Sequence, residues 1–194
     1  MKKRTLFGII TGLLVIVAAF SFQSKEGAKA APNFYASESK ILKEYNDVSE
    51  LEKDSELIIK GKKLTETPYI TRDGDMVSGF YSISDVEVKK VFKNANNEKV
   101  SKDITIKVLE NGAYDEKTNT VFGSAGYQLM KKNQNYVLFL KKDSATGRYF
   151  VKGAVFGKVA IDSQDIEYGD KGHVKQYMKE NVEKITKEVK KKYQ

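Results

Sequence analysis

The sequence contains no cysteine and a single histidine among its 194 residues. Without cysteine the chain cannot form a disulfide framework or carry a lipoprotein-type diacylglycerol anchor, so the packing of an apolar core must supply its stability. The one histidine, His173, stands at the start of the last predicted helix, and the sequence places no partners there for a histidine-based triad or a metal cluster. We therefore expect no bound metal, no cofactor and no histidine-dependent catalysis.

Motifs of phosphate, calcium and carboxylate chemistry are missing as well. No glycine-rich phosphate motif opens a predicted helix. Asp73-Gly74-Asp75 lacks the further oxygen ligands and the terminal glutamate of an EF-hand loop, so a hydrophilic turn is the better interpretation. Acid pairs such as Glu110 with Asp115 cannot be assigned a catalytic role without their separation. The chain is therefore expected not to be an enzyme, and an enzyme with a carboxylate site is kept as the minority alternative.

The first thirty residues predict export. Lys2-Lys3-Arg4 precedes an uncharged, mostly apolar run over residues 5–23, which is the order of a positive n-region and an h-region. Ala28-Lys29-Ala30 before Ala31 has the small-x-small pattern of a cleavage site, which predicts a signal peptide over residues 1–30. Alternatively, roughly 18 apolar residues at about 1.5 Å each nearly match a bilayer's hydrocarbon thickness, and the run would then be an N-terminal membrane anchor. Either alternative predicts an extracellular or cell-surface location.

The net charge of +8 is confined to the two ends of the chain. Residues 1–30 carry +4 and residues 170–194 another +4, whereas residues 31–169 contain 21 bases and 21 acids. A surface that binds nucleic acid needs a basic face, so the neutral body and the predicted export argue against a nucleic-acid partner. The 164 residues after a cleaved leader suit one domain with a single core. Exported domains without disulfides are frequent in Gram-positive bacteria, so the missing cysteines favour such a source.

The apolar pattern of the body changes from helical to strand-like. Ser37 or Ser39 could cap a helical segment and Asp47 a further turn, so residues 31–54 are predicted as a helical lead-in. Strands are predicted after it, namely at Leu57–Ile59, Phe80–Phe92, Ile104–Val108, Tyr136–Leu140, Tyr149–Val151 and Lys158–Ile161.

The longest of these runs, Phe80–Phe92, cannot be one flat strand because its apolar residues change parity. Bulges near Ser84-Asp85 and near Lys89-Lys90 would keep them all facing one way, and the glycine at Lys60-Gly61 suggests another irregularity. Long bent strands are typical of small closed barrels. We therefore predict a mainly β (α+β) fold, with a five- to six-stranded OB-like barrel over residues 55–169.

A long connection with weak periodicity runs from Gly112 to Asn135, with a short strand expected at Thr120–Gly123. Binding residues often lie on such loops, which a rigid barrel positions. The candidates for ligand binding on or beside this connection are Glu110, Tyr114, Asp115, Phe122 and Tyr127. The alternative is that Phe122 and Tyr127 simply plug the open end of the barrel.

The last 25 residues, 170–194, are predicted to form a basic amphipathic helix. Its apolar stripe consists of Val174, Tyr177, Met178, Val182, Ile185 and Val189. One interpretation packs this stripe on the barrel; the other lays the helix on an anionic lipid or teichoic acid surface. The candidate residues for such a surface are Lys171, Lys175, Lys179, Lys187, Lys190, Lys191 and Lys192.

Four of the segments in their order along the chain, Ser55–Lys62, Val86–Lys93, Ile104–Val108 and Asn135–Leu140, resemble the strands of netrin-like domains, the group that includes tissue inhibitors of metalloproteases. The chain also looks like small exported proteins of Gram-positive bacteria. The resemblance covers about residues 55–162 and implies a five-stranded OB-type barrel with helices from both ends packed against it. It does not extend to protease inhibition, because netrin-like inhibitors place an N-terminal cysteine on the protease metal and this chain has none.

Two functional hypotheses follow, besides the minority enzyme. The first is an exported, non-catalytic binding module whose barrel loops contact a protein, peptide, glycan or small ligand at the cell envelope. The second is an envelope-associated structural or interaction protein that its basic C-terminal helix holds to anionic membrane or wall polymer.

Overall fold

The computed structural model describes residues 30–37, 43–163 and 176–194. The residues from Ala31 to Gln194 form one compact unit, separate from Met1–Ala30. The predicted leader therefore lies almost wholly outside the described residues, as do Lys171 and Lys175. Within the described part, no helix combines the length and the apolar composition needed to cross a bilayer.

The larger of two sheets closes on itself. Its strands are β2 (Leu57–Asp73), β3 (Met76–Asn94), β4 (Thr105–Glu110), β7 (Asn135–Lys142), β8 (Tyr149–Val151) and β9 (Lys158–Ala160). They pair in the order β2-β3-β4-β8-β7-β9, and β7 also pairs with β2, so five strands form a closed ring with β9 outside it. The β4–β8 pair is parallel, and the other pairs of this sheet are antiparallel. The prediction of a mainly β fold with helices is confirmed.

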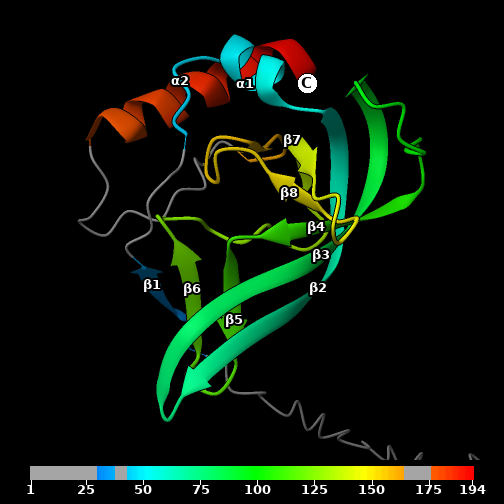
Figure 1. Cartoon of the computed structure of the whole chain (residues 1–194). Helices are drawn as coiled ribbons and strands as arrows, with labels where there is room; N and C mark the ends of the chain where they lie inside the picture. The colour runs from blue at the N-terminus through cyan, green and yellow to red at the C-terminus, as the bar shows by residue number, and fades with distance from the viewer. Residues whose placement is uncertain (1–29, 38–42, 164–175) are drawn as a thin grey trace, which may run out of the picture. The chain divides into compact units, whose positions relative to one another are not determined.

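The β2–β3 hairpin is far longer than the sequence pattern indicated, and it extends beyond the ring next to β5 and β6 (Figure 1). Its register shifts where β3 carries Lys89 as an extra residue opposite Lys60/Gly61, which confirms the bulge predicted near Lys89-Lys90. Of the three other shifts along the hairpin, one falls between Asp85 and Val86, and here the extra residue, Leu64, lies on β2. These irregularities let both strands bend from the ring into the projecting hairpin.

A small second sheet has the order β1-β6-β5, with β1 at Asn33–Ser37, β5 at Gly112–Asp115 and β6 at Thr120–Ser124. The prediction of a helical lead-in over residues 31–54 is wrong at Asn33–Ser37, because this segment is a strand that pairs in parallel with β6, and residues 38–42 lie outside the described ranges. The prediction of a loop at Gly112–Asp115 is wrong as well, because this segment pairs antiparallel with β6. For Asn33–Ser37 the partner strand lies more than 80 positions away, so no local pattern contains it. Gly112–Asp115 instead forms a short hairpin with β6, and its sequence lacks the alternation that would have indicated a strand.

The helix α1 (Val48–Asp54) begins where it was predicted. The Asp47 side chain accepts a hydrogen bond from the Glu50 backbone N–H at 2.9 Å and caps the helix. At the other end, the Tyr45 hydroxyl donates to Asp54, and this bond, together with Lys152 and Lys43, lowers the pKa of the Asp54 carboxyl to about 2. α1 is thus held at both ends.

The apolar core has two parts, one on each side of the ring wall. The first part lies inside the ring. Every second residue of the ring strands points into it, for example Leu57, Val88, Val108 and Leu138. The second part lies outside the ring and consists of the opposite faces of β2 and β7 together with the two helices. β7 is therefore buried on both faces, as its uninterrupted apolar sequence predicted.

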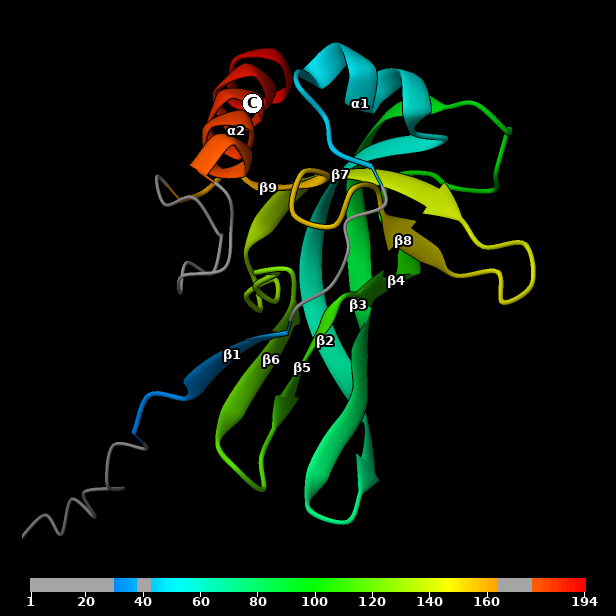
Figure 2. The same cartoon turned by 60° about the vertical axis from the view of Figure 1, so that its left-hand side comes forward.

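The C-terminal helix α2 (Gln176–Tyr193) covers this outer part of the core next to α1 (Figure 2). Met178, Val182, Ile185 and Val189 are buried, so the apolar stripe predicted from the sequence faces the barrel side. The Glu188 carboxylate accepts a hydrogen bond from the Val48 backbone N–H at 3.0 Å and ties α2 to the start of α1. Val174 and the side chain of Tyr177, the other two members of the predicted stripe, lie outside what the structure describes.

Gly123 on β6 is expected to be intolerant of any side chain. A Cβ at this position would lie 2.0 Å from the backbone oxygen of Tyr127, which cannot move without displacing the following loop. Gly123→Ala should therefore destabilise the fold by more than about 2 kcal/mol in urea denaturation, whereas Gly79→Ala, whose Cβ would meet atoms only at 3.7 Å, should be nearly neutral. Equal unfolding free energies of the two variants would show that β6 does not lie against this loop.

Candidate functional site

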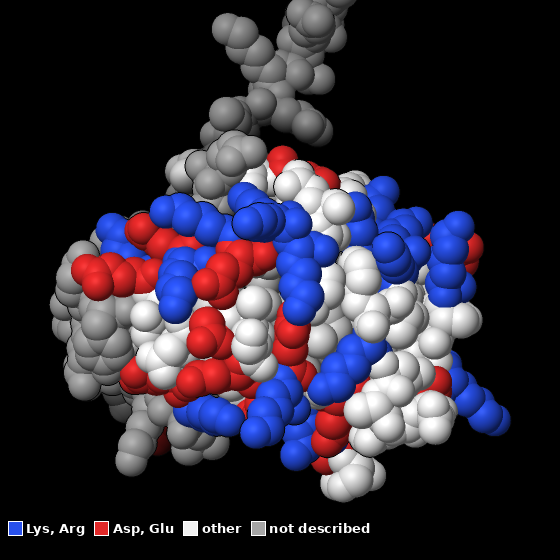
Figure 3. All heavy atoms as spheres, turned by 90° about the horizontal axis from the view of Figure 1, so that it is seen from above, with Lys and Arg blue, Asp and Glu red and all other residues white. Residues whose placement is uncertain are grey.

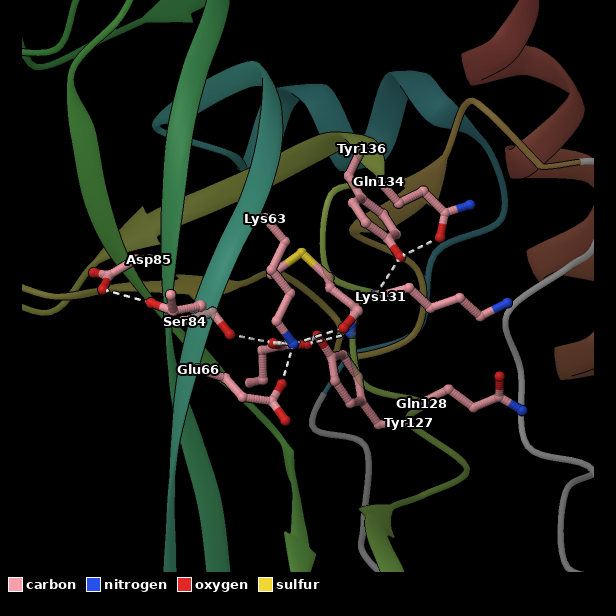
Figure 4. A network of polar contacts seen from close by, with 12 residues as sticks. Lys63, Glu66, Ser84, Asp85, Tyr127, Gln128, Lys131, Gln134 and Tyr136 are labelled. Atoms are coloured by element: carbon pink, nitrogen blue, oxygen red, sulfur yellow. Dashed lines mark hydrogen bonds and ion pairs between the residues drawn. The ribbon is translucent and has the colours of Figure 1, made fainter. Parts of the chain in front are cut away.

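Two of the predicted ligand residues, Glu110 and Tyr127, meet inside the protein at one end of the ring. Lys63, Ser84 and Glu110 continue the inward-facing rows of β2, β3 and β4, and the loop after β6 brings Tyr127 beside them (Figure 4). Glu110 and Tyr127 are fully buried, and Lys63 is 2% exposed. The polar groups thus close the end of an otherwise apolar interior.

Every oxygen and proton of the central ion pair has a partner in the chain. The Lys63 ammonium lies 3.0 Å from Glu110 Oε1, donates to the Met130 backbone oxygen at 2.6 Å and contacts Glu66. Glu110 Oε1 also accepts from the Ser84 hydroxyl, and Oε2 accepts from Tyr127 Oη at 3.0 Å and from the Met130 backbone N–H at 2.7 Å. A carboxylate satisfied in this way is engaged by its own fold and offers no free oxygen to a ligand.

Asp115 has a structural partner too. It lies on β5 and is nearly buried, 2.5 Å from Arg72 Nη2 on the projecting hairpin, and the Thr118 hydroxyl donates to it at 2.5 Å. The Thr118 bond and then the Arg72 bond hold the pKa of this carboxyl below its usual range. Asp115 therefore fastens the small sheet to the hairpin.

The remaining two candidates of the connection do not join the others. The Tyr114 hydroxyl donates to Asn119 at 3.0 Å, across the turn that follows its own strand. Phe122 lies between Tyr35 and Phe80, with ring centroids 5.5 Å from each. The five predicted ligand residues thus hold the barrel end, the hairpin and the small sheet together, and they do not converge on one cavity.

A surface groove, which we call the barrel groove, lies elsewhere. It occupies about 520 Å³ between the outer part of the β2–β3 hairpin, β4, the loop after β3 and the loop between β7 and β8. Ile83, Ile106 and Tyr149, all nearly buried, form its apolar lining. Hydroxyl side chains of Thr67, Thr105 and Thr146 line it as well. An apolar floor with a few polar groups is the usual composition of a ligand site.

Basic side chains rim the barrel groove, and two of them are already paired. Lys107 lies 2.5 Å from Asp85, and Lys142 lies 2.5 Å from Glu98. Lys99 is exposed and has no ion-pair partner among the described residues. Arg148 lies near enough to Asp143 to help lower the pKa of that carboxyl, after the hydrogen bonds that Asp143 accepts from Thr146 and Ala145. Lys99 and Arg148 are therefore the donors best placed to meet a ligand.

An aromatic pair borders the same groove. Tyr69 and Tyr81 are direct cross-strand neighbours, and their rings stack at 4.8 Å with an interplanar angle of 11°. Tyr81 therefore backs the ring of Tyr69, which lines the groove and is 42% exposed. Sequence reasoning did not single out these residues. The alternation Thr65, Thr67, Tyr69 and Thr71 was the available signal for a strand with one polar and aromatic outer face.

The lysines of the predicted anionic surface differ in their contacts. Lys179, Lys187 and Lys191 are exposed on α2. Lys190 donates to the Ser163 backbone oxygen at 2.5 Å, and Lys192 lies 2.6 Å from Glu52 on α1. Two of these five lysines thus help to dock the helix.

No group of three or more acidic, histidine or cysteine side chains within the described ranges is arranged to hold a metal ion. No protein-family model matches the chain, and no curated protein is significantly similar to it.

Proposed function

We propose that this protein is an exported, non-catalytic module that binds a glycan of the cell envelope in the barrel groove. The groove itself is the main support for this proposal. The exposed ring of Tyr69, which stacks on Tyr81, lies beside an apolar floor and threonine hydroxyls. Lys99 and Arg148 are available there as cationic donors. The leader-like sequence of residues 1–30 supports the export part of the proposal.

The strand order supports an OB-type barrel, which we propose as the specific form of the closed sheet. In an OB fold the first strand pairs with the second and the fourth, and the third and fifth strands run parallel. Here β2, β3, β4, β7 and β8 have these relations in chain order. OB folds bind oligosaccharides and oligonucleotides across the second and third strands and the loop between the fourth and fifth. The barrel groove adjoins β3, β4 and the β7–β8 loop.

A sugar suits the chemistry of this groove. One face of a pyranose ring is apolar and stacks on an aromatic side chain, while its hydroxyls need donors and acceptors around the rim. Tyr69 supplies the aromatic side chain, and Thr67, Thr105 and Arg148 supply polar partners. Because stacked Tyr81 already holds the Tyr69 ring, binding does not have to order that side chain.

The alternative in which α2 lies on a membrane is less well supported. Its apolar stripe is buried against the barrel and α1, so the helix would have to leave the core before it could insert into lipid.

Tyr69→Ala is expected to weaken binding of soluble glycan fragments from a muramidase digest of Gram-positive peptidoglycan by about tenfold or more, since losing about 1.4 kcal/mol of contact between the tyrosine ring and the apolar face of a sugar raises Kd tenfold. Isothermal titration calorimetry of the purified exported chain measures this directly. Tyr35→Ala is the matched control, because Tyr35 is 56% exposed and does not line the groove. Equal affinities of the two variants, or no binding by the wild type, would overturn the proposed site.

A further inference from the structure

A second groove, which we call the helix-end groove, lies where the ends of α1 and α2 meet β3. It occupies about 720 Å³, and four lysines line it: Lys53 from α1, Lys90 and Lys93 from β3, and Lys192 from α2. Three elements that are distant in sequence therefore direct ammonium groups to one place. None of its lining residues belongs to the barrel groove.

The acidic side chains of the groove do not balance these lysines. Among the described residues Glu52 is the one carboxylate that lines it, and it accepts hydrogen bonds from Lys192 at 2.8 Å and from the Tyr193 hydroxyl at 2.5 Å. Lys93 donates to the Glu52 backbone oxygen at 2.7 Å, so it satisfies a carbonyl near the end of α1. Two of the four lysines are thus committed to the fold.

Lys53 and Lys90 are the uncommitted pair. Both are exposed, and neither has a carboxylate partner among the residues that the structure describes. The Lys90 ammonium lies 4.9 Å from the centre of the Phe92 ring, which holds it over the groove without neutralising it. Over part of the face seen in Figure 3, basic and acidic side chains lie next to one another.

We propose that the helix-end groove binds an anionic phosphodiester polymer of the cell wall. Lysine is a point charge that binds phosphate without a fixed geometry, whereas planar recognition of carboxylates favours arginine, and all four cations here are lysines. A polymer with one charge per repeat can engage Lys53 and Lys90 together and release counterions from both. A lipid surface is the less suitable occupant, because the apolar stripe of α2 is buried in the core and cannot insert beside the lysines.

The test is a salt series of binding to soluble poly(glycerol phosphate), with the full exported chain. Lys53→Gln/Lys90→Gln should weaken binding about tenfold or more at low salt and reduce the slope of log affinity against log salt by about 1.4, at about 0.7 for each lost contact with a flexible polyanion. The control Lys187→Gln/Lys191→Gln also removes two positive charges, but from exposed positions of α2 that do not line the groove. It should change the affinity less than twofold.

Three results would overturn the proposal: no binding of the polymer by the wild type, equal losses in both double variants, or tighter binding to phosphatidylglycerol vesicles than to the polymer. Tyr69→Ala serves as a further control. It should bind the polymer like the wild type, so failure of the glycan site and failure of the polymer site give different results.

Discussion

Replacing Lys63 by methionine is expected to lower the free energy of unfolding by about 3–5 kcal/mol, because it leaves the fully buried Glu110 carboxylate without its counter-ion. Methionine fills nearly the same volume, so the effect reports the lost charge and its hydrogen bonds more than a cavity. Urea denaturation of the wild type and the variant gives the difference directly.

A double variant tests whether the loss of stability comes from the Lys63–Glu110 ion pair. Lys63→Met/Glu110→Gln removes both charges and retains acceptor and donor groups for Ser84, Tyr127 and Met130, so it should be less destabilised than Lys63→Met alone. Lys102→Met, at a lysine with 70% exposed side chain, should stay within about 0.5 kcal/mol of the wild type. If Lys63→Met were no less stable than Lys102→Met, the ion pair would not close the end of the ring.

Ile185→Ala on α2 is expected to cost about 2–5 kcal/mol, because this side chain is 1% exposed and its truncation leaves a cavity between helix and barrel. The neighbouring Lys184→Ala removes an exposed side chain and should change the unfolding free energy by less than about 0.5 kcal/mol. Both values come from the same denaturant titrations.

The pair Ile185→Ala and Lys184→Ala also separates the two interpretations of the C-terminal helix. A helix that lay on an external surface would contribute little to folding, and Ile185→Ala would then weaken vesicle binding while leaving stability unchanged. That outcome would contradict the packed position of α2.

The strands and helices with a strong periodic pattern could be predicted from the sequence. Leu57–Ile59, Tyr136–Leu140 and the stripe from Met178 to Val189 are all buried as expected, because a strand or helix that covers a core must present apolar residues at its own period. The parity change in Phe80–Phe92 likewise predicted a bulge at Lys89-Lys90. Local pattern sufficed wherever burial alone determined the conformation.

The small sheet and the outer hairpin could not be predicted in the same way. Asn33–Ser37 and Gly112–Asp115 become strands because each pairs with β6, and neither segment carries an alternating pattern of its own. Beyond Lys63 most β2 residues are exposed or half-buried, so this part of the strand lacks the apolar alternation by which strands are recognised.

The roles of the predicted site residues could not be predicted for a different reason. Glu110 and Asp115 attracted attention as acidic residues beside a glycine- and asparagine-rich connection, and both are paired with cations from β2, namely Lys63 and Arg72. Partners separated by more than forty positions cannot be recognised from spacing. The barrel groove likewise combines four separate segments, and only its tyrosine and threonine alternation was visible in the sequence.

The most direct test of the glycan-binding account is methyl chemical-shift mapping of the isotope-labelled exported chain during titration with the peptidoglycan fragments. Glycan binding in the barrel groove should give concentration-dependent shifts of the Ile83 and Ile106 methyl groups in the groove floor and leave the buried Ile185 of α2 unperturbed. Shifts confined to other methyl groups, or a spectrum that the fragments leave unchanged, would contradict it.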